Sequence, residues 1–367
     1  GSIVLIKNFL KIIMIFSPIK IGSLEVSNRI VVAPMCQYSA INGVMTDWHA
    51  QHLMQLGYSA AGLIMVEATA VEDIGRITHN CVGIYDDKCV LSLKKNLQLA
   101  KSVAPNKSCF GIQLAHAGRK ASTQRPWEGR GSLKDEEKPW QTICPSPIPF
   151  QETWHVPQEM KLSDIERVNK QFINASLKAV EIGFDLIEIH GTHGYLLHQF
   201  LSPISNKRKD KYGGSLENRM RFPLEVFYSV KNVLPKDFPL GMRITGTDWE
   251  NNGIDEDEAS IFAKELEKIG CHYVCVSSGG NTPSPKIPLG PHYQVHLAKR
   301  IKKDTEIVVR TVGMIKDPFE ANNILINQEA DMVAMARAFL SNPRWVWDAA
   351  KILNHDIEVP PQYARRI

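Results

Sequence analysis

Short, β-branched apolar runs alternate along this chain with longer segments that have the period of a helix. Such an alternation is typical of a parallel sheet covered by helices. Strands are predicted over residues 29–33, 63–67, 109–114, 185–190, 240–245, 273–277, 306–310 and 332–336. Eight strand–helix units favour a closed barrel over an open sheet. The predicted fold is therefore α/β, a single (β/α)8 TIM barrel.

Capping residues predict where several of the intervening helices begin. Residues 163–166 read Ser-Asp-Ile-Glu, which is a capping box in which Ser163 opens a helix. Asp255 is expected to cap the helix that follows the fifth strand. Asp317 is expected to cap another helix, because Pro318 fits the first turn directly after it.

One domain is predicted over residues 15–367, because no stretch rich in Pro, Gly or Ser divides the chain and no internal repeat is present. Residues 1–14 are assigned to an expression scar, Gly1-Ser2, followed by an upstream extension. The apolar stretch 3–16 is interrupted by charged residues and is too short to span a bilayer. No membrane partner is therefore expected.

The segment Ala115–Lys161, after the third predicted strand, is much longer than an ordinary loop and is rich in Pro, Trp and charged residues. A loop of this length in a compact domain is usually functional. It leaves the barrel at the carboxyl ends of the strands, which is the face where barrel active sites lie. We predict that this loop insertion forms a lid or one wall of a substrate pocket.

The charge balance and the cysteines exclude several classes of protein. Forty-three basic and thirty-nine acidic residues leave a net charge of +4 without any Lys/Arg-rich run, so no nucleic acid is expected as a partner. The seven cysteines form no CxxC pair, and Cys271 and Cys275 have no second pair, which argues against structural zinc. An odd number of cysteines fits a reducing, cytoplasmic location better than a disulfide framework.

Polar residues of unusual type stand at the carboxyl ends of the predicted strands. Because all of these ends open on one face of a barrel, the side chains are expected to converge there. They are Cys36, Gln37 and Tyr38 after the first strand, Glu67 at the second, Gln113 and residues 115–120 at the third, residues 190–195 at the fourth, Arg243 in the fifth, residues 277–280 after the sixth, Arg310 and Gly313 at the seventh, and Arg337 after the eighth.

Four segments make the sequence similar to a known family. They are APMCQYS (33–39), GIQLAHAGRKA (111–121), GFDLIEIHGTHGYLLHQFLSPISNKRKDKYGGSLENRMRF (183–222) and MARAFLSNP (335–343). On these motifs the chain resembles the Old Yellow Enzyme family of NADH:flavin oxidoreductases, specifically its bacterial xenobiotic-reductase-like branch. The resemblance extends from about Ile15 to the C-terminus, and the third segment is far more specific than a lone glycine motif.

The resemblance implies FMN as the cofactor, with NADPH or NADH as its reductant. The implied cofactor-binding residues are Ala33, Pro34, Met35, Cys36, Ala68, Gln113, Arg243, Gly313, Ala336 and Arg337. The Gln113 amide can both donate to and accept from the pyrimidine edge of the flavin. The fixed charge of Arg243 would stabilise the anionic reduced flavin, and Arg337 would hold the phosphate. The family usually has Gly where this chain has Ala336.

The resemblance also assigns the catalytic groups. His190 and His193 would donate hydrogen bonds to the carbonyl or nitro oxygen of the substrate, each worth about 3 kcal/mol in the transition state. Tyr195 would act as general acid towards the α-carbon, while hydride from the flavin reaches the β-carbon. Cys36 is implied to lie near the flavin and tune its redox behaviour, although most cysteines are only small buried apolar residues. Tyr38 is implied to contact the substrate oxygen.

Arg365 is a candidate substrate-binding residue of another kind. In part of this branch a C-terminal arginine reaches the active site of a neighbouring subunit, which implies a homo-oligomer, a dimer or a tetramer. This chain lacks the terminal tryptophan of some relatives and has Ser341 where some have a second arginine. A surface charge is the simpler interpretation of Arg365, and both interpretations stay open.

Other kinds of barrel chemistry were weighed against the flavin enzyme. His190 and His193 have the spacing of a zinc pair, but a metal-dependent TIM-barrel hydrolase needs further His or carboxylate ligands. The same spacing at His49 and His52 lies on a predicted helix and is interpreted as structural. A Schiff-base enzyme needs a lysine buried at a strand end. No predicted strand contains one, and Lys120 is either a solvated charge or a residue of the flavin pocket.

The predicted function is that of an ene-reductase. It is an FMN-dependent NAD(P)H oxidoreductase that reduces the activated C=C bond of α,β-unsaturated carbonyl or nitro compounds by a ping-pong mechanism, with small molecules as its substrates and no metal. The alternative is the metal-dependent hydrolase that uses the His pair as ligands. A closer rival, a 2-enoate or dienoyl-CoA reductase, would also show an iron–sulfur cysteine cluster, which this sequence does not.

Overall fold

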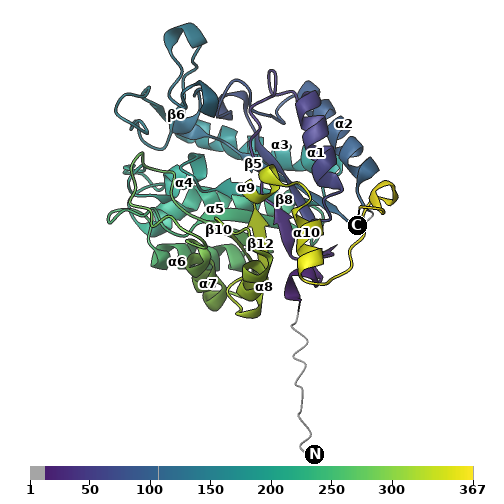
Figure 1. Ribbon diagram of the computed structural model, residues 1–367. Coiled ribbons are helices and arrows are strands. Elements are labelled where there is room, and N and C mark those ends of the chain that lie inside the picture. Colours follow the sequence, from purple (N-terminus) through teal and green to yellow (C-terminus); the bar gives the residue numbers. More distant parts are fainter. Residues whose placement is uncertain (1–12, 106, 367) are drawn as a thin grey trace, which may run out of the picture.

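The computed structural model describes residues 13–105 and 107–366 and confirms the predicted barrel. Its strands close in the order β10-β11-β12-β3-β4-β5-β8-β9, and helices lie between consecutive strands of the chain (Figure 1). Every neighbouring pair in the barrel is parallel, so all carboxyl ends open on one face. The predicted upstream extension lies, up to Ile12, outside the described residues.

The barrel strands form close to where the apolar runs predicted them. They are β3 (Ile30–Val32), β4 (Leu63–Ala70), β5 (Cys109–Ala115), β8 (Leu186–Gly191), β9 (Leu240–Thr245), β10 (Tyr273–Ser277), β11 (Val308–Val312) and β12 (Met332–Met335). The sequence analysis did not predict a short antiparallel hairpin that precedes them, β1 (Ile19–Ile21) and β2 (Leu24–Val26).

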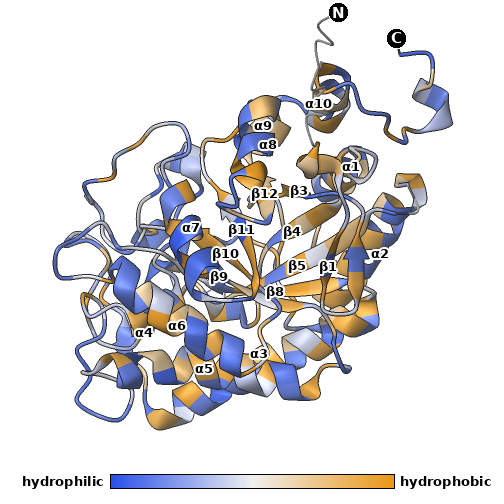
Figure 2. Ribbon diagram, turned by 90° about the horizontal axis from the view of Figure 1, so that it is seen from below, coloured by the Kyte–Doolittle hydropathy of each residue, from blue (hydrophilic) through white to orange (hydrophobic). Residues whose placement is uncertain are grey.

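The helices pack around the barrel and shield its strands from water. They are α1 (Asp47–Gly57), α2 (Asp87–Val103), α3 (Leu162–Ile182), α4 (Leu196–Leu201), α5 (Leu216–Val233), α6 (Glu256–Lys268), α7 (Val295–Asp304), α8 (Pro318–Ile326), α9 (Arg337–Ser341) and α10 (Trp345–Ile352). Figure 2 shows the hydrophobic strands enclosed by helices that carry hydrophilic residues on their outer sides. None of the helices in the described part is long and apolar enough to cross a membrane.

Successive side chains of each strand point alternately into the barrel and towards the helices. Val31 and Leu63 belong to a small apolar cluster inside the barrel, whereas Ile30 packs in the larger cluster that includes the helices. The β1–β2 hairpin adds Ile21 and Val26 to the inner cluster. The interior is therefore filled with side chains, and a site can open only at the strand ends.

The seventh strand differs from its prediction. It was expected over residues 306–310, but β11 begins and ends two residues later, at Val308–Val312. The prediction treated the charge of Arg310 as the end of the strand. In the structure this side chain is fully buried and paired with Glu188, so the strand continues past it.

One predicted helix cap is also wrong. Ser163 lies inside the first turn of α3, whose N-cap is Lys161. The backbone N–H of Lys161 donates to the Asp164 carboxylate at 2.8 Å, so the aspartate satisfies the end of the helix. Asp255 and Asp317 cap α6 and α8 as predicted, because each side chain accepts a backbone N–H of the first turn.

The segment between β5 and α3, predicted to be a lid or a pocket wall, stands out from one end of the barrel (Figure 1). It contains only 3-10 turns and the two-residue strands β6 (Ile143–Cys144) and β7 (Gln158–Glu159). Buried arginines hold it in place. Arg119 donates to the carbonyls of residues 148 and 149, and Arg208 donates to those of Pro145 and Met160. Its role as a lid or a wall stays a prediction.

Candidate active site

A cavity of about 680 Å³ opens at the carboxyl ends of the strands. Its wall includes His193, Arg243, Gly313, Ala336 and Arg337, all of which the sequence analysis named. These residues belong to or follow β8, β9, β11 and β12, so the closure of the barrel brings them together. The volume lies in the range of sites for small ligands and cofactors.

The predicted residues of the first three strands are not part of the lining of this cavity: β3 is the neighbour of β12, which contributes to the cavity, whereas Ala68 lines a separate small hollow together with Tyr195. Ala33 and Ala68 are buried, and residues 34–36 are half-buried. The backbone N–H of Ala33 donates to the carbonyl of Met335 at 3.0 Å, which joins the end of β3 to the end of β12. Backbone of this segment is therefore fixed at the rim of the barrel.

Three rings of the 190–195 loop meet edge to face. The His190 and His193 ring centroids are 5.3 Å apart with an interplanar angle of 86°. The His190 and Tyr195 centroids are 5.0 Å apart at 75°. His190 is the penultimate residue of β8, and Tyr195 is the N-cap of α4. The strand and the short helix thus present the predicted donors and the predicted acid as one cluster.

Burial keeps both imidazoles neutral. Desolvation, and after it the charge of Arg243, lowers the pKa of His190 and of His193 well below the usual 6.5. Thr192 N–H donates to His190 Nδ1 at 3.4 Å, which leaves the ring proton on Nε2. His193 Nε2 lies 2.7 Å from the Ser277 hydroxyl. A neutral imidazole donates from one nitrogen only, so these contacts determine which nitrogen of each ring can serve a ligand.

The phenols near the histidines stay protonated. Burial, and then the nearby Cys36 thiol, raises the pKa of Tyr195 far above its usual value. Burial raises the pKa of Tyr38 as well, with Cys36 and Tyr195 as the next contributors, so the three groups lie close together. Trp127, from the segment after β5, packs edge-on against Tyr38 at 5.9 Å. Burial also raises the pKa of Cys36, which keeps this residue a thiol.

Arg243 carries an unused donor. Its side chain is only 8% exposed, and its Nε has no hydrogen-bond partner within residues 13–105 and 107–366. The register of β8 and β9 places it directly beside His190. A buried guanidinium is always charged and needs an acceptor. The cavity wall is therefore suited to a ligand that is anionic or rich in hydrogen-bond acceptors.

Gln113 is held by a polar layer inside the barrel. Its Nε2 donates to Glu188 Oε2 at 2.9 Å. Glu188 Oε1 accepts from Arg310 at 2.9 Å and from the Tyr273 hydroxyl at 3.1 Å. The Arg310 guanidinium also lies 4.6 Å from the centre of the Tyr273 ring. These contacts fix one N–H of the Gln113 amide and thereby the direction of its other groups.

Lys120 is not the solvated charge that one interpretation of the sequence proposed. Its ammonium group donates to the carbonyls of His193 and Gly280, both at 2.8 Å. It also lies 4.7 Å from the centre of the Phe150 ring and 5.0 Å from that of Tyr195. Burial, and after it two nearby arginines, lowers the pKa of Lys120 to about 7. Carbonyl oxygens and ring faces thus replace much of the water around this half-buried lysine, and its place in the flavin pocket stays a prediction.

Glu67 is a buried carboxyl group behind the loop that follows β3. It accepts the Gln37 N–H at 3.2 Å and lies 3.4 Å from His49 Nε2. Burial raises the pKa of Glu67 to about 8 and lowers that of His49 to about 4. His49 Nε2 makes no hydrogen bond in the described part of the chain, so this neutral pair only packs α1 against the loop. Within residues 13–105 and 107–366, no group of three or more His, Cys, Asp or Glu side chains is arranged to hold a metal ion.

Glu67→Gln is expected to change how the stability of the apoprotein depends on pH. The folded protein keeps the Glu67 proton up to about pH 8, whereas the unfolded chain loses it near 4.5. Between these values the folded state holds one more proton, so its stability falls as pH rises, by at most about 1.4 kcal/mol per pH unit. The variant cannot ionise and should lose this contribution. Urea unfolding across this pH window measures it, and parallel curves for both proteins would contradict it.

For several residues the structure leaves a prediction untested or adds a contact that was not predicted. Arg365 is exposed on the C-terminal segment, and its contact with a neighbouring subunit stays a prediction. Three residues without an assigned role contact the predicted site: Ser277 meets His193, Glu188 meets Gln113, and His198 meets the turn after His193. Ser277 had been named among the polar residues at the strand ends, but without a role.

The chain is similar to known proteins over most of its length. The sequence profile of the NADH:flavin oxidoreductase / NADH oxidase family matches residues 14–356. An NADPH dehydrogenase of a Geobacillus species is 41% identical over 354 residues, which make up 96% of this chain and 98% of the relative.

Solved structures share the fold. A 2-naphthoyl-CoA reductase in complex with 2-naphthoyl-CoA superposes with a TM-score of 0.83 at 22% identity. The match covers 92% of this chain, which spans about half, 52%, of that longer protein. A morphinone reductase mutant in complex with tetrahydroNAD superposes with a TM-score of 0.73 at 25% identity, over 92% of this chain and 91% of that one.

Proposed function

The chain belongs to the NADH:flavin oxidoreductase / NADH oxidase family, and we propose that within it the protein is an FMN-dependent ene-reductase. NADPH or NADH is the reductant, and the activated C=C bond of an α,β-unsaturated carbonyl or nitro compound is the oxidant. The observation that carries this proposal is the cluster of two neutral histidines and one protonated tyrosine, which reaches the cavity through His193. The two histidines offer hydrogen-bond donors for one substrate oxygen, and the tyrosine beside them offers a proton.

The residues of the cavity fit FMN. Arg243 has an unpaired Nε for the N1–C2=O edge of the flavin, and Gln113 presents an oriented amide. Gly313 has a φ of 125°, a left-handed conformation that lets backbone approach a ligand without a side chain between them. Arg337 lines the same cavity and can pair with the phosphate. When bound, FMN supplies two-electron hydride chemistry between the nicotinamide and the substrate.

The protein's own part in the reaction is to polarise the substrate and to supply a proton. His190 donates from Nε2, and with His193 it draws charge onto the substrate oxygen as the β-carbon is reduced. Because both rings are neutral, they form a preorganised site without carrying a buried charge. Tyr195 keeps its proton until the α-carbon takes it, which completes the saturation of the double bond.

The hydrogen bonds of His193 decide whether it can play this part. Its Nε2 faces the Ser277 hydroxyl, so Nδ1 must carry the proton that goes to the substrate oxygen. This requires Ser277 to donate to Nε2. The same hydroxyl can also donate to Gln294 Oε1 at 3.4 Å, but that oxygen already accepts a short hydrogen bond from Ser278. In the proposed arrangement Ser277 donates to His193 Nε2, and the imidazole proton stands on Nδ1.

The domain organisation, the location and the assembly of the protein are proposed from the same family membership and the same residues. Residues 15–367 form one FMN-binding domain, and the enzyme acts in the cytoplasm as a homo-oligomer. The alternative, a hydrolase with His190 and His193 as metal ligands, has no support in the family that the chain matches. The described residues also offer no third ligand beside that pair.

An anaerobic absorption experiment tests the proposed function in a single cuvette. The purified protein should show flavin bands, which NADPH should bleach and 2-cyclohexenone should restore, because each half-reaction changes the oxidation state of the flavin. Bands that bleach but do not return with an enone or a nitroalkene would rule out the proposed substrate class. A protein that stays colourless after incubation with FMN would rule out the cofactor.

A further inference from the structure

We propose that His198, oriented by Asp248, is a positioning residue that holds the turn between His190 and Tyr195 in its catalytic shape. This inference rests on the proposed function, because the shape of the turn matters only if His193 and Tyr195 meet the substrate. His198 itself lies behind the turn and belongs to α4.

The turn has an unfavourable backbone conformation. His193 has a φ of 60° and Gly194 a φ of 74°, so two consecutive residues are left-handed. A residue with a Cβ rarely adopts this conformation, and His193 is such a residue. At Gly194 an added Cβ would lie 2.1 Å from the Gly280 carbonyl oxygen, so this position requires glycine. A turn of this kind persists only where its surroundings hold it.

The polar backbone groups of the turn are held by side chains from three directions. The His193 carbonyl accepts from Lys120 at 2.8 Å. The Gly194 N–H donates to His198 Nδ1 at 2.8 Å, and its carbonyl accepts from Gln199 at 2.7 Å. Among these partners only His198 fixes an N–H, and it does so at the residue between the two catalytic side chains.

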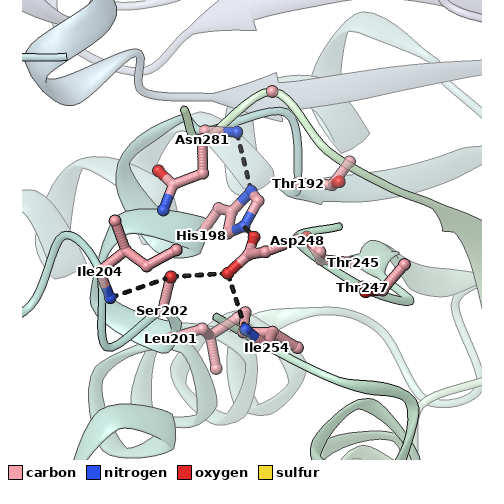
Figure 3. A network of polar contacts seen from close by, with 12 residues as sticks. Thr192, His198, Leu201, Ser202, Ile204, Thr245, Thr247, Asp248, Ile254 and Asn281 are labelled. Carbon is pink, nitrogen blue, oxygen red and sulfur yellow. Dashed lines mark hydrogen bonds and ion pairs between the residues drawn. The ribbon is translucent and has the colours of Figure 1, made fainter. Parts of the chain in front are cut away.

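His198 is itself fixed by a buried carboxylate, as Figure 3 shows. Both side chains are fully buried, and His198 Nε2 donates to Asp248 Oδ1 at 2.6 Å. Asp248 Oδ2 accepts from the Ser202 hydroxyl at 2.7 Å and from Ile254 N–H at 2.8 Å. Burial favours the neutral acid, but His198 and these donors outweigh it and keep the pKa of Asp248 below its usual range. Because the proton sits on Nε2, Nδ1 is free to accept from Gly194.

The pair connects two loops of the barrel. His198 follows β8, whereas Asp248 lies in the loop after β9, so the two strands jointly determine where the turn stands. If the turn changes its conformation, His193 and Tyr195 are displaced together. His190 stays in place, because it is part of strand β8. A displacement of about 1 Å in a catalytic geometry can slow a reaction by about 100-fold.

The test compares His198→Leu, which removes the acceptor, with His198→Asn, whose amide oxygen can replace Nδ1. Enzyme reduced by NADPH is mixed rapidly with either 2-cyclohexenone or oxygen. In the Leu variant the enone reaction should fall by about 100-fold, and the oxygen reaction, which needs neither His193 nor Tyr195, should stay within about twofold. The Asn variant should recover most of the enone rate.

Two readouts are independent of turnover. Hydrogen exchange of the peptide 190–197 should be faster in His198→Leu and return towards the wild-type rate in His198→Asn, because the Gly194 N–H loses and regains its acceptor. The affinity for FMN, measured by fluorescence titration, should stay within about twofold in both variants, since the hydrogen bonds of His198 go to Gly194 and Asp248, neither of which is a proposed cofactor residue.

His116 provides a matched control. Its Nδ1 accepts the Gly118 N–H at 3.1 Å, and its Nε2 lies 3.0 Å from Glu72, so the arrangement is the same on another loop. His116→Leu should leave the ratio of enone to oxygen rates unchanged.

An unchanged enone rate in His198→Leu, or a parallel loss of both rates and of FMN affinity without rescue by Asn, would overturn the inference. If the wild type is not reoxidised by enones, the proposed function fails, and hydrogen exchange still decides whether His198 holds the turn.

Discussion

Tyr195→Phe is expected to slow reoxidation of the reduced enzyme by 2-cyclohexenone by about 10²- to 10⁴-fold, which is the usual contribution of a positioned general acid. Burial keeps the phenol protonated, and the Tyr195 ring lies 5.0 Å from that of His190, so its proton stands beside the polarised substrate. Reduction by NADPH needs no proton from this residue and should stay within about twofold. Stopped-flow absorbance of each half-reaction separates the two effects.

Tyr38→Phe is the matched control for this experiment. It removes a hydroxyl from the same corner of the pocket, but Tyr38 is proposed to bind the substrate oxygen and not to transfer a proton. Loss of one hydrogen bond predicts a reduction of about tenfold or less. If Tyr195→Phe reacts with the enone no more slowly than Tyr38→Phe, then Tyr195 is not the acid.

Arg243 and Arg310 show which properties of a residue can be predicted from the sequence alone and which cannot. Both were named as polar residues at the carboxyl ends of predicted strands, and the barrel with its common face of strand ends was predicted from the alternation of apolar runs and helical segments. The structure separates the two residues. Both guanidinium groups keep nitrogens without a hydrogen-bond partner in the described part of the chain, but Arg243 lines the cavity, whereas Arg310 is paired with Glu188 inside the barrel. The partners are 122 residues apart in the chain, so no local pattern could reveal the pair or the resulting length of β11.

The loop after β8 shows a second limit. Resemblance to a family indicated His190, His193 and Tyr195, because a motif preserves the types of the side chains. It did not indicate the left-handed turn or its support by His198, since these depend on contacts with the loop after β9. Lys120 likewise stayed open between two interpretations. The carbonyl groups around its ammonium, which decide the matter, come from distant segments of the chain.

Arg310→Met is expected to destabilise the protein by about 3–5 kcal/mol, because it leaves the Glu188 carboxylate buried without its counter-charge. The double variant Glu188→Gln/Arg310→Met should recover most of this loss, since no charge stays unpaired: the amide oxygen can accept from Tyr273, and the amide NH2 can donate to Gln113 once that side chain turns its own oxygen towards it. Urea unfolding of the apoproteins measures both changes.

FMN affinity should fall by about tenfold in Arg310→Met, the loss of roughly one well-placed hydrogen bond, because Glu188, which holds the Gln113 amide, loses the guanidinium that fixes it. If Arg310→Met is as stable as the wild type, then the pair does not hold the polar layer of the barrel. If stability falls but FMN affinity does not, then Glu188 does not orient Gln113 towards the cofactor.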